Sequence, residues 1–100
     1  MRGGYVYIMS NKNRTTFYTG VTSRLPDRVR EHKEGKGGAF TSRYRCYDLI
    51  YYDDFPTIVE AIQREKQIKN WHREWKINLI KSINPDLKDL SDDVLWEFRS

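Results

Sequence analysis

The chain has 100 residues, of which 38% are hydrophobic and 14% aromatic, and its 18 Lys and Arg against 14 Asp and Glu give a formal net charge of +4. This length supports one small domain, and no apolar run approaches the roughly 18 residues that cross a bilayer, so a cytoplasmic protein without a membrane partner is expected. Cys46 is the only cysteine, which excludes an intramolecular disulfide, and with only two histidines a zinc site of Cys and His ligands is excluded as well. A bound metal would therefore be a hard ion held by carboxylates and water.

Positive charge is concentrated in the first half of the chain. Residues 1–52 contain ten Lys and Arg and four Asp and Glu, whereas residues 53–100 contain eight and ten. In the basic aromatic segment, residues 24–47, basic side chains are interleaved with aromatic ones, a mixture that suits a phosphate backbone with stackable bases. A solvated surface loop is the alternative. The nucleic-acid-binding residues predicted here are Arg24, Lys36, Arg43 and Tyr44.

The chain begins with a predicted β-hairpin. Residues 5–9 and 17–21 are rich in β-branched and aromatic side chains, and turn-forming residues separate them. The two-residue period of a strand allows Tyr7 and Tyr18 to meet across the pair.

A helix of about three turns is predicted next, between Ser23 and Gly35, from its start and stop signals. Leu25, Val29 and His32 fall on one stripe of this helix. A third strand is predicted over residues 49–52.

From Thr57, a long helix is predicted, because apolar residues keep a 3.6-residue period as far as Leu79. A turn at Asn84 and a short amphipathic helix after Ser91 follow. The side chains expected to pack this last stretch are Val94, Leu95, Trp96 and Phe98.

Glu65 occupies an unusual place for a carboxylate, within the apolar stripe of the long helix between Ile62 and Ile68. An unpaired buried carboxylate is costly, so a cation is expected as its partner. That cation is either a metal or an arginine of the first helix. The other alternative is that the apolar pattern is displaced by one residue, which would place Glu65 outside the stripe.

Arg28 and His32 lie four residues apart and therefore share one face of the first helix. A guanidinium on such a face is suited to bind phosphate, and an imidazole beside it can move a proton near neutral pH. The alternative is an amphipathic helix with an extended Arg and a His at the edge of the core.

The order of these side chains resembles that of the GIY-YIG nuclease family, in particular its small stand-alone bacterial branch. The residues that carry the resemblance are Tyr7, the step Tyr18-Thr19-Gly20, Arg28, His32 and the step Arg64-Glu65. Thr19 replaces the usual Ile of the second motif, and Tyr5 stands where the first motif has its Gly. Asn84 is similar to a late Asn of the family.

The resemblance implies an α+β fold, with a small, mostly antiparallel three-stranded sheet flanked by helices and an extra C-terminal helix. Residues 1–83 would form the nuclease domain, and residues 84–100 a helical extension packed on it. It also implies a metal-dependent DNA endonuclease acting on single-stranded, double-stranded or branched DNA. Glu65 would hold Mg²⁺ or Mn²⁺, and Arg28 would contact the phosphate.

In this mechanism, Tyr7 would act as the general base, with Tyr18 and His32 positioning the attacking water or relaying its proton. A phenol with a pKa of about 10 is only about 0.1% ionised at pH 7, so its pKa has to be lowered by Arg28 and the metal. Activity is then expected to rise with pH above neutrality.

Two other functions are compatible with the sequence. A non-catalytic nucleic-acid-binding protein would use the basic aromatic segment and need no divalent metal. An interaction adaptor would use Trp71, Trp75 and Trp96, for which a place in the core is the favoured prediction.

Overall fold

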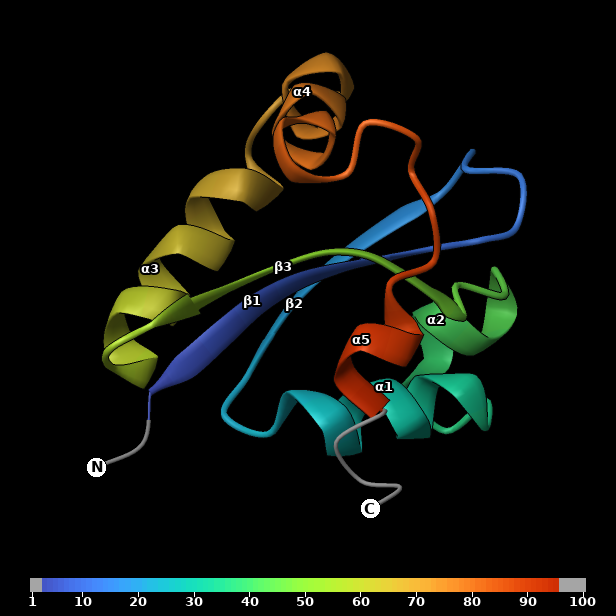
Figure 1. Cartoon of the computed structure of the whole chain (residues 1–100), viewed down its shortest axis with the longest axis horizontal. Helices are drawn as coiled ribbons and strands as arrows, with labels where there is room; N and C mark the ends of the chain where they lie inside the picture. Colours follow the sequence, from blue (N-terminus) through green and yellow to red (C-terminus); the bar gives the residue numbers. More distant parts are fainter. Residues whose placement is uncertain (1–2, 96–100) are drawn as a thin grey trace.

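The first strand, β1 (Gly4–Ser10), is the middle strand of a three-stranded antiparallel sheet (Figure 1). The predicted hairpin joins it to β2 (Phe17–Thr22), and β3 (Asp48–Phe55) pairs with its other edge, so the strand order is β2-β1-β3. This computed structural model describes residues 3–95. The predicted α+β class and three-stranded sheet are confirmed.

Helices cover both faces of the sheet (Figure 1). They are α1 (Leu25–Lys33), α2 (Ala39–Arg43), α3 (Ile58–Lys69), α4 (Arg73–Ile83) and α5 (Ser91–Leu95). Successive side chains of β1 point to opposite faces, so Val6 and Ile8 join the core under α3 and α4, while Tyr7 and Met9 join the core under α1 and α5. Because β1 is buried on both faces, its sequence is apolar almost throughout.

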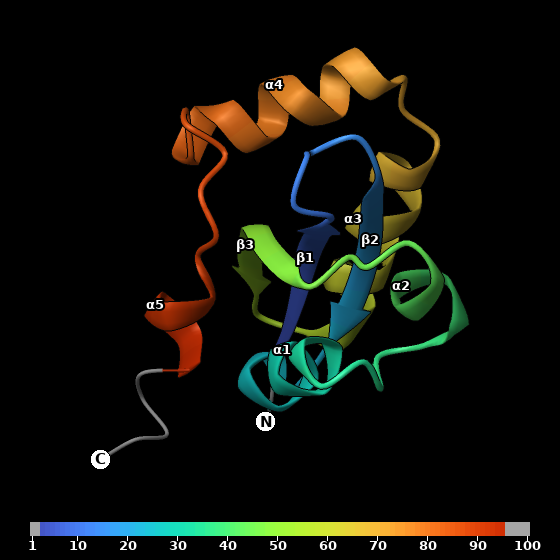
Figure 2. The same cartoon turned by 90° about the vertical axis from the view of Figure 1, so that its right-hand side faces the viewer.

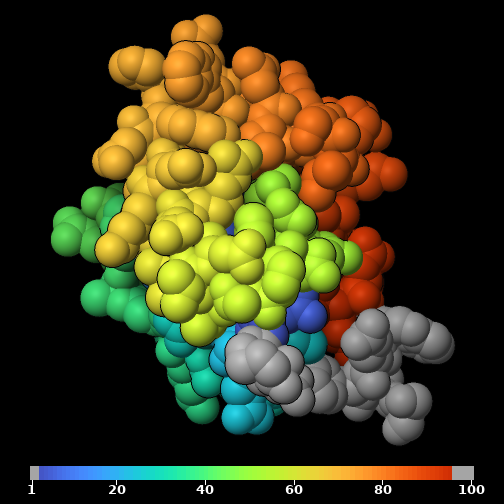
Figure 3. Space-filling model, turned by 90° about the vertical axis from the view of Figure 1, so that its left-hand side faces the viewer, coloured from blue at the N-terminus to red at the C-terminus, as the bar shows by residue number. Residues whose placement is uncertain are grey.

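The long helix predicted over residues 57–79 is wrong, because the chain breaks between α3 and α4. Asn70 caps the end of α3, and His72 has an extended backbone where α4 begins. An unbroken helix of this length, rising about 1.5 Å per residue, would be as long as the 34 Å longest dimension of the whole molecule. The break instead allows α4 to bury Ile80 in the core that α3 shares. Figure 3 shows α3 and α4 side by side on the surface.

Two further features differ from the prediction. After the predicted first helix, the basic aromatic segment contains a second, short helix, α2, which the sequence did not predict. The third strand continues to Phe55, beyond the predicted end at residue 52, because its backbone pairs with β1 as far as Gly4. Asp53 and Asp54 are exposed, so their carboxylates stay in water while the backbone completes the strand.

The segment after α4 lies against β3 and α1. The backbone N–H of Leu90 donates to the carbonyl oxygen of Leu49, and Asp89 accepts a hydrogen bond from the Leu49 N–H at 3.0 Å. Val94 is buried beside α1, and Leu95 packs at the edge of the same core, as predicted. Trp96 and Phe98 lie outside the described residues.

The prediction that the tryptophan side chains are part of the core is only partly correct. Trp71 packs against the core, whereas Trp75 is 55% exposed, so its predicted burial is wrong. Trp96 lies outside the described residues. Over residues 3–95, no helix has the length and apolar character needed to span a membrane.

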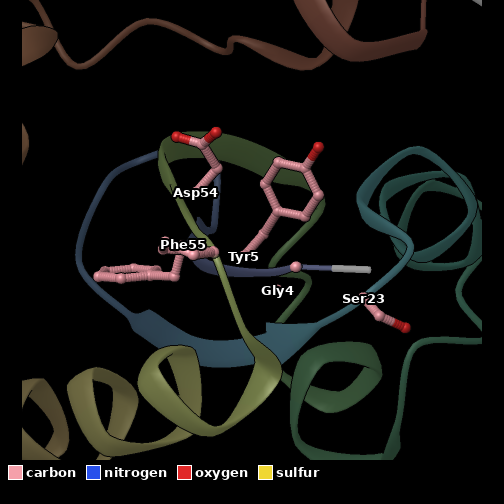
Figure 4. Close-up of a pocket in the computed structure, with 7 residues that line it drawn as sticks. Gly4, Tyr5, Ser23, Asp54 and Phe55 are labelled. Atoms are coloured by element: carbon pink, nitrogen blue, oxygen red, sulfur yellow. The ribbon is translucent and has the colours of Figure 1, made fainter. Parts of the chain in front are cut away.

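A small cavity lies at the start of β1, where the ends of the strands meet (Figure 4). Tyr5 and Asp54 are paired on neighbouring strands, and their side chains point to the same face of the sheet. None of the predicted site residues lines this cavity.

Candidate active site

Tyr7 connects the central strand to α1 through its hydroxyl group. The side chain is 1% exposed, and its oxygen lies 3.1 Å from Nε2 of His32 and 3.3 Å from Nε of Arg28. The guanidinium N–H can only donate, so the hydroxyl accepts from Arg28. Its own proton is then directed at the imidazole. The structure therefore brings together three of the predicted site residues.

His32 is fully buried below Tyr7. Burial, reinforced by the positive charge of Arg28, lowers the pKa of the imidazole from its usual 6.5 to about 4. The ring is neutral at pH 7, so we assign Nε2 as the acceptor of the Tyr7 proton. Among the described residues, nothing forms a hydrogen bond with its other nitrogen, Nδ1.

Two glycines allow the backbone to approach this pair. A Cβ atom on Gly20 would lie 2.5 Å from the hydroxyl oxygen of Tyr7, and one on Gly37 would lie 2.0 Å from Nδ1 of His32. Side chains at either position would therefore displace the pair. Gly37 lies two residues after the predicted stop of the first helix at Gly35, and the sequence did not identify it as part of the site.

Burial also changes the acidity of Tyr7. It raises the pKa of this phenol to about 12, although the hydrogen bond and charge of Arg28 act in the opposite direction. The expectation that Arg28 helps to lower this pKa is correct in sign, but the effect of Arg28 is smaller than that of burial. Without a further cation the phenol is protonated at neutral pH.

Arg28 is held in place from three sides and does not extend freely into water. Besides its bond to Tyr7, it donates to Glu31 at 2.8 Å and to the carbonyl oxygen of Gly37 at 2.8 Å. The hydrogen bond to Glu31 raises the pKa of the guanidinium above its usual value. Of its five N–H groups, three are engaged in this way and two remain for a ligand.

Tyr18 extends the site toward the surface. Its ring centroid lies 6.4 Å from that of Tyr7 and 5.9 Å from that of His32, so the two tyrosines meet as the strand period predicts. On its other side, the Tyr18 ring centroid lies 5.9 Å from that of Phe40, and the Phe40 centroid lies 4.8 Å from that of Tyr44. We call these three side chains, Tyr18, Phe40 and Tyr44, the aromatic ladder. Phe40 lies four residues before Tyr44 in the basic aromatic segment, and the sequence already indicates either ring as a stacking surface for a single strand.

Glu65 is buried on α3, as its position in the apolar stripe predicts, with 8% of the residue exposed. Its ion pair is with Lys69 of the same helix, at 2.6 Å, so the alternative of an arginine from the first helix is wrong. The helix α3 packs against β1 and β2. The contacts among Tyr7, Arg28 and His32 do not extend to Glu65 within residues 3–95.

The carboxylate of Glu65 fits a magnesium-type ion, because such ions are commonly held by one or two carboxylates together with water and substrate phosphate. Only one of its oxygens, Oε2, is engaged by Lys69. The part of the chain that the structure describes has no group of three His, Cys, Asp or Glu that could enclose an ion. Glu65 would therefore be the main protein ligand.

The side chain of Asn84 is held by backbone groups of the fold. It is buried, and its amide donates to the carbonyl oxygens of Ile50 and Lys88, each at 2.9 Å, and accepts from the N–H of Lys88. These contacts tie the segment after α4 to β3. The amide is thus engaged with backbone groups.

The residues predicted to bind nucleic acid lie at the surface around α1 and α2. Arg24 pairs with Asp27 at 2.7 Å, and Lys36 is exposed in the turn before α2. The guanidinium of Arg43 lies 5.6 Å from the centre of the Tyr44 ring, which is itself 44% exposed. An exposed ring beside a cation is compatible with base stacking.

Comparison with known proteins identifies the family to which the chain belongs. The GIY-YIG catalytic domain family matches residues 3–78. A UPF0213 protein of Staphylococcus haemolyticus is 36% identical over 77 residues, which cover 77% of this chain and 93% of the relative. A UPF0213 protein of Staphylococcus aureus is 35% identical over 81 residues, covering 81% and 98%.

Among solved structures, the solution NMR structure of a UPF0213 protein from Bacillus halodurans is similar, with a TM-score of 0.56 and 28% identity. The similarity covers 90% of this chain and 95% of that one. The family match spans most of the chain, including Tyr7, Tyr18, Arg28, His32 and Glu65. This chain therefore belongs to the GIY-YIG catalytic domain family.

Proposed function

We propose that this protein is a metal-dependent endonuclease that hydrolyses phosphodiester bonds in DNA. The observation that carries the proposal is the position of the Tyr7 hydroxyl between Arg28 and His32. This hydroxyl can receive a proton on its oxygen while it passes its own proton to the neutral imidazole. Family membership supports the same chemistry.

The proton transfer proceeds through the side chains of Tyr7 and His32. The attacking water gives a proton to the Tyr7 oxygen as the Tyr7 proton moves to Nε2 of His32. The water oxygen bonds to phosphorus and the bond from phosphorus to the 3′ oxygen breaks. The departing 3′ oxygen takes a proton from solvent water, which yields a 5′-phosphate and a 3′-hydroxyl. This route needs no preformed phenolate, which the raised pKa of Tyr7 disfavours.

Arg28 stabilises the charge that develops on the phosphate. Its two unengaged N–H groups are available to non-bridging oxygens, and its contacts with Glu31 and Gly37 hold the guanidinium in place before substrate arrives. Glu65 would hold Mg²⁺ or Mn²⁺, which supplies Lewis-acid stabilisation of the leaving 3′ oxygen when bound. Lys69 balances the Glu65 charge in its absence.

The test is cleavage of labelled single-stranded, double-stranded and branched DNA with Mg²⁺, Mn²⁺ or EDTA. Tyr7→Phe and Glu65→Gln are each expected to lower the rate by roughly 10²- to 10⁴-fold. Tyr51→Phe is the matched control, because this tyrosine is also buried but joins the core on the other face of the sheet.

Cleavage that persists in EDTA, or that is equal in Tyr7→Phe and Tyr51→Phe, would overturn the assignment. Salt-sensitive binding in every variant with no cleavage by any would favour the non-catalytic nucleic-acid-binding protein instead.

A further inference from the structure

A cavity of about 630 Å³ lies between the turn that joins β1 to β2 and the segment that leads from α2 into β3. Figure 2 looks onto this end of the molecule. The side chains used below are Lys12, Asn13, Tyr44, Arg45 and Tyr47, and we call their site the turn cavity. Its volume lies within the roughly 300–1,000 Å³ that is typical of ligand sites.

The turn cavity offers two unengaged cations beside Tyr44 and Tyr47. The side chains of Lys12 and Arg45 are exposed, and neither forms a hydrogen bond or ion pair with any other described residue. Asp48 also lines the cavity, but Arg14 at 2.8 Å and Lys33 at 3.5 Å already neutralise its charge. The cavity therefore has a positive rim.

The aromatic ladder connects this cavity to the catalytic side chains. Tyr44 is the last member of the ladder and also lines the cavity. The first member, Tyr18, contacts both Tyr7 and His32. A strand whose phosphate lies at Arg28 can thus continue over exposed rings into the cavity.

We propose that the turn cavity binds an unpaired nucleobase and its phosphate, one or a few nucleotides from the cleaved bond. This proposal rests on the proposed function. Tyr44 and Tyr47 provide ring surfaces for stacking, Lys12 and Arg45 neutralise phosphate, and the amide of Asn13 can donate to and accept from a base edge.

The base has to be unpaired, because both faces of a base in a duplex are covered by its neighbours. The substrate class is therefore DNA with an unpaired nucleotide beside the cleavage site. A stacked base contributes enough that its loss weakens binding roughly 5- to 150-fold.

The experiment measures binding of a short fluorescein-labelled oligodeoxythymidylate by anisotropy in EDTA, with a single abasic residue placed at each position in turn. One position is expected to weaken binding by at least about fivefold. Tyr47→Leu should bind the intact strand more weakly than the wild type, and an abasic residue at that position should not weaken its binding further. Tyr44→Ala is a second variant from which the same result is expected. Tyr44 is exposed, so its loss does not disturb the core.

A charge series completes the test. Lys12→Ala and Arg45→Ala should each reduce the slope of log affinity against log salt by roughly one, while Lys81→Ala on the exposed side of α4 should not. Equal penalties at all abasic positions, or penalties unchanged by Tyr47→Leu, would overturn the cavity assignment. If metal-dependent cleavage continues in that case, the proposed function stands; a wild-type chain that neither binds nor cleaves DNA overturns both.

Discussion

The hydroxyl oxygen of Tyr7 lies 3.1 Å from Nε2 of His32, a residue 25 positions further along the chain. Both side chains are buried, and burial shifts the two pKa values in opposite directions, to about 12 for the phenol and about 4 for the imidazole. At neutral pH the pair is therefore an uncharged proton donor beside an uncharged acceptor. This state is suited to a proton relay and unsuited to a standing phenolate.

The relay predicts a cleavage rate that is nearly independent of pH between about pH 6 and 9. Over this range His32 stays unprotonated and Tyr7 stays protonated, given pKa values of about 4 and about 12. The measurement is the single-turnover rate in Mn²⁺ across this range. A rate that rises about tenfold per pH unit would contradict the relay and support the phenolate expected from the sequence.

Folding stability is expected to fall as the pH is lowered from about 6.5 toward 4. In this window the imidazole of unfolded His32 binds a proton and the folded one does not, because its pKa is lowered to about 4. As the pH is lowered, the unfolded state therefore binds this proton before the folded state does. The full decrease in the free energy of unfolding is about 3 kcal/mol. Urea unfolding of His32→Gln should lack this pH dependence. His72→Gln, at an exposed position, should keep it.

Gly37→Ala is expected to lower the cleavage rate at least about tenfold and to destabilise the fold by about 1–3 kcal/mol. The added Cβ would lie 2.0 Å from Nδ1 of His32, so the imidazole has to move away from Tyr7. Gly35→Asn is the control, since a Cβ there meets no atom within 4 Å and Asn tolerates its positive φ of 76°. Cleavage assays and urea unfolding check both variants; a fully active Gly37→Ala would refute the packing argument.

Lys69→Gln is expected to tighten Mn²⁺ binding by a few-fold. The ammonium lies 2.6 Å from a carboxylate oxygen of Glu65 and competes with a metal for it. Lys69 is half exposed, so solvent screening limits the gain to about 0.3–1 kcal/mol. Calorimetric titration of Mn²⁺ measures the change, with Lys66→Gln as an exposed control on the same helix. Weaker binding would show that Lys69 assists the metal site.

Asp89→Asn is expected to destabilise the protein by about 2 kcal/mol. Its carboxylate pairs with Lys33, and it accepts hydrogen bonds from the N–H groups of Leu49 and Ser91. These contacts hold the last described segment against β3 and α1. Asp86→Asn, at an exposed position nearby, should leave the free energy of unfolding within about 0.5 kcal/mol of the wild type. An equal loss in both variants would argue against this role.

Local sequence patterns were sufficient for the elements whose structure depends on neighbouring residues. The β-branched and aromatic residues around Tyr7, the start and stop signals around α1 and the apolar period that begins at Thr57 each predicted an element that the structure contains. The apolar stripe also predicted the burial of Glu65. In each case the periodicity of a single helix or strand determines which side faces the core.

Tertiary structure decided the features that depend on packing between distant segments. The break between α3 and α4 was not visible in the periodicity, because the apolar spacing continues across it as far as Leu79. Lys69 replaced an arginine as the partner of Glu65, since the ion pair depends on which cation reaches a buried oxygen. The pKa of Tyr7 likewise depends on the depth at which the fold buries it, and desolvation there outweighs the nearby charge of Arg28.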